Sequence, residues 1–235
     1  MSDWVDFYDS QHSLIYVNPR HRDVHYRTIA EDIREYVSSP SAQVIDFGCG
    51  EATSANIIAD AAGHLTMVEA APNVRAALER RYSGNAKISV MTPEQAEAMP
   101  PQSADLIVLH SVAQYLTPAE LDGMLTTFHR LLKPDGLLIV GDIVPASLAA
   151  PKAALSLLWF AARNGFFFAA FFGLVRIALS DYSRLSKQQP LTHYDTDAML
   201  AKLRKAGYLA ARSETNIGHN PWRMTFLARL ACPKA

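Results

Sequence analysis

Short apolar runs alternate with helical patterns from residue 43 to about residue 143. The apolar runs are Gln43–Phe47, His64–Glu69, Lys87–Met91, Asp105–His110 and Gly136–Ile143. Between them, apolar spacing and prolines at helix starts predict helices over Ala52–Ala61, Pro72–Tyr82 and Pro118–Leu132. Apolar strands separated by helices are typical of a parallel sheet with helices on both faces. We therefore predict an α/β fold with a doubly wound sheet.

The segments that flank this core predict one helix before it, and a helix and two strands after it. Apolar residues form one helical stripe within Arg22–Val37. After the core, Asp195–Ala206 has the pattern of a capped helix, and Tyr208–Ile217 and Met224–Leu230 have the pattern of a hairpin. The sheet is then mostly parallel, with seven strands and an antiparallel last strand. We expect one domain over residues 1–235, with residues 1–40 as an N-terminal helical cap.

Residues 146–181 form an unusually apolar insertion after the fifth strand. Ala153–Ala162 and Gly165–Val175 contain no charged residue, and six of the ten phenylalanines lie in this insertion. Each half is shorter than the roughly 18 apolar residues of a membrane-spanning helix. Two short helices that are apolar on nearly all sides are buried in a lid or a dimer interface, or else lie in a membrane surface. These alternatives stay open, and each of them makes the acceptor entrance apolar.

Charge and cysteine usage narrow the class of protein. The net charge is -1, and no long basic run suggests that the chain binds nucleic acid. Cys49 and Cys232 are too few for a disulfide framework, which suits a reducing compartment. The first residues lack the basic and apolar regions of a secretory signal. We expect a cytoplasmic protein, peripheral to a membrane if residues 146–181 lie on one.

The end of the first strand carries the clearest ligand signal. Gly48 and Gly50 let the backbone approach a ligand closely, and the following helix offers free N–H groups. The alternative is a tight strand-to-helix connection without a ligand. A dinucleotide fingerprint needs a third glycine where Thr53 stands. The acidic Asp46 also favours a cationic ligand, such as a sulfonium with an α-ammonium group, over a pyrophosphate.

This turn resembles the first motif, D/E-x-G-x-G, of class I S-adenosylmethionine (SAM) dependent methyltransferases. The resemblance covers about residues 40–145 and the final hairpin, and that family has a seven-stranded sheet with an antiparallel last strand. It implies that SAM is the cofactor and that the turn binds it through Asp46, Phe47, Gly48, Cys49 and Gly50.

The second strand supplies the next expected contact. Glu69 ends this strand and is placed to accept hydrogen bonds from the ribose hydroxyls, with Ala70 beside it. The alternative is an ordinary acid near the start of the helix at Pro72.

Gln95–Pro100 resembles the family's adenine-reading segment, D-A-x-x-L-P, with Gln95 in place of the acid and Ala96 after it. The Gln95 carbonyl can still accept from the adenine amino group. Glu94 either lines the adenine pocket with Thr92 and Pro93 or is an exposed acid at a helix start.

The end of the fourth strand, Leu109–Leu116, resembles the family's fourth motif. It implies that His110 and Ser111 lie beside the methionine part of SAM and that Tyr115 lies near the lid. A histidine at a strand end is usually structural, so we expect the backbone of His110, more than its imidazole, to make the contact.

Methyl transfer depends mainly on positioning, and a general base assists hydroxyl or phenol acceptors. His219 lies in a loop that we expect at the carboxyl edge of the sheet, so it is the candidate catalytic base. The alternative is that it stabilises its loop, and His193 is a second candidate.

The N-terminal segment offers further candidates. His21 and His25 are one helical turn apart but lack a third partner, so we expect no metal. The resemblance implies that Tyr16, Arg20 or Tyr26 contacts the carboxylate of the cofactor, whereas a solvated basic helix face is the alternative.

The sequence therefore predicts a SAM-dependent methyltransferase that acts on a small, apolar or lipid-like acceptor, as a monomer or a homodimer. Two other functions are a non-catalytic SAM-binding or lipid-surface protein and a nicotinamide oxidoreductase. The oxidoreductase is disfavoured by Thr53 and by the final hairpin.

Overall fold

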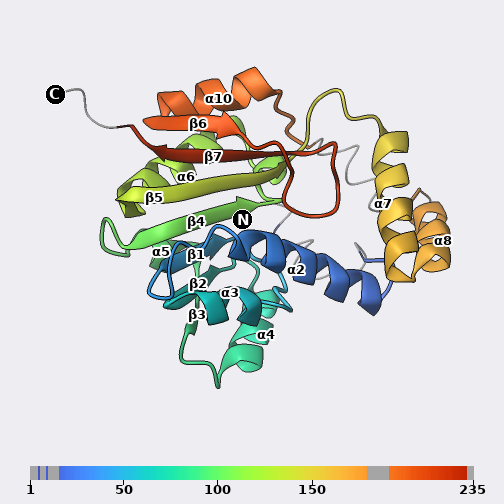
Figure 1. Cartoon of the computed structure of the whole chain (residues 1–235), viewed down its shortest axis with the longest axis horizontal. Helices are drawn as coiled ribbons and strands as arrows, with labels where there is room; N and C mark the ends of the chain where they lie inside the picture. Colours follow the sequence, from blue (N-terminus) through green and yellow to red (C-terminus); the bar gives the residue numbers. More distant parts are fainter. Residues whose placement is uncertain (1–4, 6–8, 10–15, 179–190, 232–235) are drawn as a thin grey trace.

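A twisted seven-stranded sheet lies between two layers of helices in the computed structural model (Figure 1). The structure describes residues 5, 9, 16–178 and 191–231. The strands are β1 (Gln43–Phe47), β2 (His64–Val68), β3 (Ile88–Met91), β4 (Ala104–His110), β5 (Leu132–Ile143), β6 (Tyr208–Arg212) and β7 (Met224–Leu230). Their order is β3-β2-β1-β4-β5-β7-β6. Strands β1 to β5 are parallel, and β7 is antiparallel to both β5 and β6. The predicted fold class is confirmed.

Helices cover both faces of this sheet. The described helices are α2 (Pro19–Arg34), α3 (Asn56–Ala61), α4 (Pro72–Tyr82), α5 (Pro93–Glu97), η2 (Ala113–Tyr115), α6 (Pro118–Leu131), α7 (Ala150–Asn164), α8 (Phe167–Ala178) and α10 (Thr196–Lys205). Helices α2, α3 and α4 bury apolar side chains on one face, where they meet Val44 of β1. Helices α6 and α10 pack on the other face, where they meet Ile45. Successive side chains of a strand point to opposite faces of the sheet, so they pack into two separate cores.

Two predicted boundaries moved because side chains bind the backbone at turns. The helix predicted from Ala52 begins at Asn56, since Ala52 has a positive φ of 36°. The Tyr82 hydroxyl donates to the Ala52 carbonyl (2.5 Å) and accepts from the Ala55 amide (3.2 Å), which holds this segment as a turn. Helix α2 begins at Pro19, earlier than predicted, because the Asn18 side chain accepts from the His21 amide (2.8 Å).

Strand boundaries also shifted near the ends of the sheet. β5 starts at Leu132 rather than at Gly136. The residues between these two positions form an irregularity in the pairing of β5 with β4. β6 stops at Arg212 rather than Ile217, whose amide donates to the Thr225 hydroxyl (3.0 Å). Residues 213–223 consequently form a long loop at the carboxyl edge of the sheet.

The apolar insertion folds as the helix pair α7 and α8. Gly165 ends α7 with a φ of 74° and separates the two apolar halves of the insertion. Among the described residues, no helix is both long and apolar enough to cross a membrane. Residues 179–181 of the predicted insertion, much of the N-terminal cap before residue 16, and Cys232 lie outside the described part of the chain.

Candidate functional site

The turn after β1 can form only because glycines stand at two of its positions. Gly48 and Gly50 have φ values of 76° and 59°, in the left-handed region. A Cβ on Gly48 would lie 2.4 Å from Val112 Cγ2, and one on Gly50 would lie 2.6 Å from the Tyr26 hydroxyl oxygen. Both conformation and space therefore require glycine at these two positions.

Glu69 joins this turn to the turn after β2. Its Oε2 accepts from the Gly50 amide (2.9 Å), and its Oε1 accepts from the Ala71 amide at the start of α4 (2.8 Å). Burial raises the pKa of the Glu69 carboxyl, although these amides oppose the shift. Each oxygen keeps a further lone pair, so the carboxylate can still accept from a ribose diol. Glu69 therefore also takes the helix-start role that was the alternative, and the two roles are compatible.

The surroundings of Asp46 favour a positively charged ligand. Its carboxyl is buried on β1, and burial together with the nearby Glu69 raises its pKa to about 7. A positively charged group bound at the turn would stabilise both carboxylates, whereas a pyrophosphate would repel them. The residues of this turn thus fit a sulfonium with an α-ammonium group.

The segment expected to read adenine forms a capping box at the start of α5. The Thr92 hydroxyl accepts from the Gln95 amide (3.2 Å), and Gln95 Oε1 accepts from the Thr92 amide (2.8 Å). The expected contact of Gln95 with adenine stays a prediction, and it requires the second lone pair of this oxygen. Glu94 is exposed, as expected of a helix-start acid, whereas Ala96 is buried.

A buried carboxylate, Asp142, lies where β4 and β5 end side by side. The Ser111 hydroxyl donates to Asp142 Oδ2 (2.6 Å), and Arg223 pairs with the same oxygen. Burial alone would raise the pKa of Asp142, but Arg223, His110 and Ser111 hold it below its usual value. Ser111 and Asp142 have φ values of 59° and 62°, and such backbone strain clusters at functional sites.

Asp142 and Arg223 were missed by sequence reasoning. A charged residue directly after the apolar run Leu137–Gly141 was the available signal. His110 has partners for both ring nitrogens, the Ser111 hydroxyl (3.1 Å) and the Ile217 carbonyl (3.2 Å). This geometry favours the structural role for its imidazole.

His21 and His25 of α2 meet His219 of the loop at residues 213–223, at the carboxyl edge of the sheet. We call these three residues the histidine cluster. The ring centroid of His219 lies 5.7 Å from that of His25 and 6.3 Å from that of His21. Burial lowers the pKa of His21 and of His219 to about 4, and that of His25 well below its ordinary value. The cluster is therefore uncharged near neutral pH. Among the described residues, no group of His, Cys, Asp or Glu is arranged to hold a metal ion.

Helix α7 and the turn that joins it to α8 supply an aromatic wall to this cluster. The His219 ring stacks on Phe160, with centroids 4.4 Å apart, and the His21 ring stacks on Phe166, with centroids 5.1 Å apart. The Ser156 hydroxyl donates to the His219 carbonyl (3.3 Å). The loop that carries His219 is thus packed against α7.

The N-terminal residues divide between the turn and the helix pair. The Tyr26 hydroxyl accepts from the Glu51 amide (2.9 Å) and from the Tyr16 hydroxyl (3.0 Å), so both phenols lie at the glycine turn. Tyr115 lies close enough to influence the pKa of Tyr16. Arg20, in contrast, donates to the Asn164 carbonyl at the end of α7 (2.5 Å).

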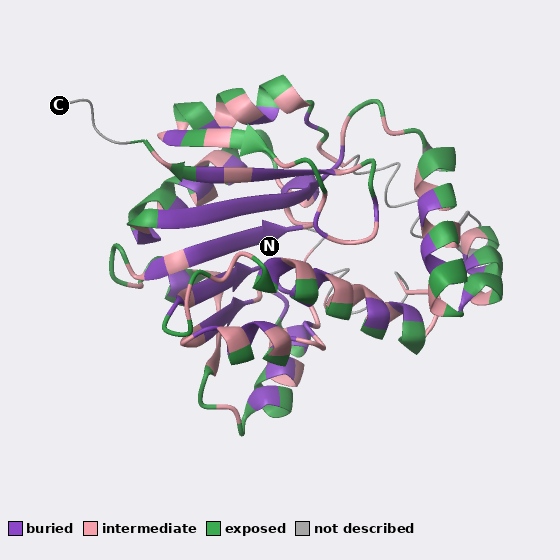
Figure 2. Cartoon of the chain, in the orientation of Figure 1, coloured by how far each residue is buried: buried purple, intermediate pink, exposed green. Residues whose placement is uncertain are grey.

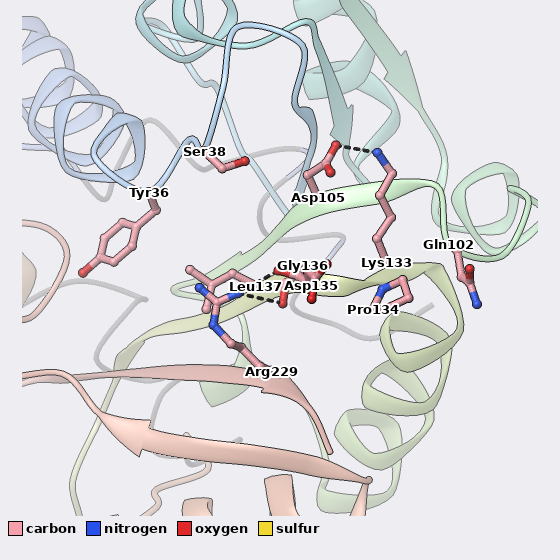
Figure 3. Close-up of a pocket in the computed structure, with 10 residues that line it drawn as sticks. All are labelled: Tyr36, Ser38, Gln102, Asp105, Lys133, Pro134, Asp135, Gly136, Leu137 and Arg229. Carbon is pink, nitrogen blue, oxygen red and sulfur yellow. Dashed lines mark hydrogen bonds and ion pairs between the residues drawn. The ribbon is translucent and has the colours of Figure 1, made fainter. Parts of the chain in front are cut away.

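A pocket at the opposite edge of the sheet is not part of this arrangement. Its ten lining residues are Tyr36, Ser38, Gln102, Asp105, Lys133, Pro134, Asp135, Gly136, Leu137 and Arg229 (Figure 3). Lys133 pairs with Asp105 (2.7 Å), and Arg229 donates to the Asp135 carbonyl (2.7 Å). Ligands of open α/β sheets bind outside the carboxyl ends of the strands, whereas this pocket lies where β4 and β5 begin.

Comparison with known proteins gives a family for the core. The family described as "Methyltransferase domain" matches residues 45–140, which run from within β1 to within β5. No curated protein matches the chain.

Several solved structures share the fold. Magnesium protoporphyrin IX methyltransferase from Synechocystis PCC 6803, with bound SAM, is 14% identical with a TM-score of 0.63, over 97% of this chain and 96% of that chain. Human N-acetylserotonin methyltransferase in complex with SAM is 16% identical with a TM-score of 0.57, over 88% of this chain and 52% of that chain. The DhpI–SAH complex is 10% identical with a TM-score of 0.62, over 97% of this chain and 96% of that chain.

The matched region contains the glycine turn, Glu69 and Ser111. Residues 45–140 thus match a methyltransferase domain, and the chain shares its fold with the methyltransferases named above that were solved with bound SAM.

Proposed function

We propose that this chain is a SAM-dependent methyltransferase that acts on a small apolar or lipid-like acceptor, which binds between the glycine turn and the inner side of α7 and α8. The observation that carries the proposal is the stacking of Phe160 and Phe166 on His219 and His21. These rings are uncharged near neutral pH, because burial lowers the histidine pKa values. Such a wall attracts apolar surface and offers few partners to a polyhydroxylated or charged acceptor.

The residues at the turn would hold the cofactor, and the contact of His25 with Tyr26 places the histidine cluster beside that turn. Bound SAM supplies an electrophilic methyl group on a sulfonium. Asp46 and Glu69 stabilise the positive charge and the ribose, and Gly48 and Gly50 allow close approach of the backbone. The aromatic side chains of α7 and α8 exclude water from the acceptor, so positioning accounts for most of the rate.

We further propose His219 as the general base for a hydroxyl acceptor. Burial keeps its imidazole neutral, so a ring nitrogen is free of a proton and can accept one from the acceptor hydroxyl. Asp142 opposes the effect of burial and stabilises the imidazolium that would result.

Labelled SAM incubated with fractionated cell extract tests the acceptor class. We expect label in the organic-soluble fraction, and label confined to polar metabolites would contradict the proposal. For a hydroxyl acceptor found in this way, His219→Ala should lower turnover by about 10²–10⁴-fold while SAM affinity stays nearly constant. His129→Ala is the matched control, since His129 lies on α6 against Tyr208, near the start of β6 and not at the carboxyl edge of the sheet. Equal turnover in the two variants would show that positioning alone suffices.

A further inference from the structure

The outer side of α7 and α8 carries an exposed apolar surface. Nine large apolar side chains are exposed among the described residues, and seven of them belong to this helix pair. We call these seven the aromatic face: Leu155, Trp159, Phe167, Phe168, Phe171, Phe172 and Val175. Concentration on one surface distinguishes them from the singly scattered apolar residues of an ordinary protein surface.

Both helices are amphipathic in the tertiary structure, although their sequences are apolar on nearly all sides. Phe160, Ala161, Phe166 and Ala170 form a small core with Val24 of α2. Gly173 packs closely on Val17, two residues before α2, because a Cβ on Gly173 would lie 2.4 Å from Val17 Cγ1. The inner sides therefore pack on Val17 and Val24, and the exposed residues follow the outer sides of both helices at one end of the molecule (Figures 1 and 2).

The charged residues of α7 and α8 are all basic. From residue 146 to residue 180 the sequence contains Lys152, Arg163 and Arg176 and no Asp or Glu. Lys152 and Arg163 are exposed and share the helical spacing of Leu155 and Trp159, so they lie on the same side of α7. The Arg163 guanidinium lies over the Trp159 ring, 4.7 Å from its centroid. Aromatic side chains flanked by cations are characteristic of helices that lie in a membrane interface.

We propose that the aromatic face docks onto an anionic phospholipid bilayer, with α7 and α8 in the plane of the interface. Phe168 and Phe172, which are 75% and 67% exposed, enter the acyl boundary, and Lys152 and Arg163 meet the headgroup phosphates. A symmetric dimer through the same face fits less well, because an isologous contact brings the like charges of the two copies together. Helices of 15 and 12 residues are too short to span a bilayer, which restricts the contact to its surface.

Vesicle flotation tests this docking without any acceptor or turnover. The wild type should float with vesicles of phosphatidylcholine and phosphatidylglycerol, float less with phosphatidylcholine alone, and lose binding as salt is raised. The double variant Phe168→Ala/Phe172→Ala should lower the partition coefficient by about tenfold or more. Lys152→Glu/Arg163→Glu should abolish the preference for the anionic vesicles.

Leu209→Ala is the matched control, because Leu209 is 67% exposed on β6 and distant from the helix pair. It should float like the wild type. S-adenosylhomocysteine binding by calorimetry should be equal in all the variants, which establishes that they are folded. Absence of wild-type flotation with the anionic vesicles would overturn the proposal. So would equal loss in Leu209→Ala, or a stable dimer in light scattering that Phe168→Ala/Phe172→Ala dissociates.

Discussion

At the scale of single residues, Glu69 fixes the shape of the candidate site. Its two oxygens hold the amides of Gly50 and Ala71, so the turns after β1 and β2 are fixed relative to each other before any ligand arrives. Pre-organisation of this kind reduces the entropy lost when the cofactor binds. The exposed Glu94 has no comparable contact, and its hydrogen bond with Thr92 lowers its pKa.

Replacement of these two acids separates their roles. Glu69→Ala should weaken SAM and S-adenosylhomocysteine binding by about 1.5–3 kcal/mol, because a charged hydrogen-bonding partner is lost. Glu69→Gln should lose less, since one acceptor oxygen remains. Glu94→Ala should bind like the wild type in the same calorimetric titration. Loss of affinity in Glu94→Ala would instead place Glu94 in the adenine pocket, and binding of NAD in preference to S-adenosylhomocysteine would contradict the assignment of the turn.

At the scale of elements, the two sides of the helix pair have different neighbours. Phe160 on the inner side of α7 stacks on His219, whereas Phe168 on the outer side of α8 is exposed. Phe167 and Phe171 on α8 are also exposed, at 40% and 49%. An apolar pattern alone does not say which side of a helix faces a pocket.

Truncation on the inner side should therefore affect the acceptor, and truncation on the outer side should not. Phe160→Ala should raise the acceptor KM by removing about 1.5–3 kcal/mol of apolar contact, while the dissociation constant of SAM stays unchanged. Phe168→Ala should leave the KM of a detergent-dispersed acceptor at the wild-type value. Steady-state kinetics with varied acceptor check both variants. A larger effect from Phe168→Ala would show that the outer side contacts the acceptor.

At the scale of the whole molecule, the carboxyl edge of the sheet collects segments that are distant in sequence. The start of α2, the ends of β4 and β5, the helix pair and the loop at residues 213–223 all meet there (Figure 1). Asp32 of α2 accepts from the Gly218 amide (2.7 Å) and fixes this loop beside α2. Burial of the histidine cluster is a result of this assembly, so its protonation is linked to folding.

The linkage predicts lower stability in acid. The pKa of His21 is about 4 in the folded chain and about 6.5 when unfolded, so unfolding takes up a proton between these values. This contribution is complete above about pH 6.5 and is lost as the pH falls toward about 4. Asp46 acts with the opposite sign, because its pKa is raised to about 7.

His21→Phe isolates the effect of one histidine, since Asp46 is present in both proteins. Between about pH 6.5 and about pH 4, the Tm of the wild type should fall more steeply than that of His21→Phe. Thermal unfolding across this range measures both slopes. Parallel slopes would show that His21 titrates normally in the folded chain.

The sequence by itself determined the helices and strands and the glycine turn after β1, because both depend on local information. β1, α4 and β7 have the boundaries that spacing and prolines predicted. Gly48, Gly50 and Glu69 belong to one strand-helix-strand unit, whose geometry follows from the chain itself. The order of apolar strands likewise predicted the sheet and its antiparallel last strand.

Only the tertiary structure decided which distant side chains meet. His21, Phe160 and His219 are nearly 200 residues apart at their extremes, and no periodicity in the sequence relates them. The oxygen of Gln95 caps α5, because a local partner is always close to it. Helices α7 and α8 are apolar on nearly all sides, so packing on α2, on Val17 and on the loop that carries His219 selected the inner side and left the aromatic face exposed. An apolar pattern states that a side chain favours burial, whereas the surface that buries it is a property of the assembled chain.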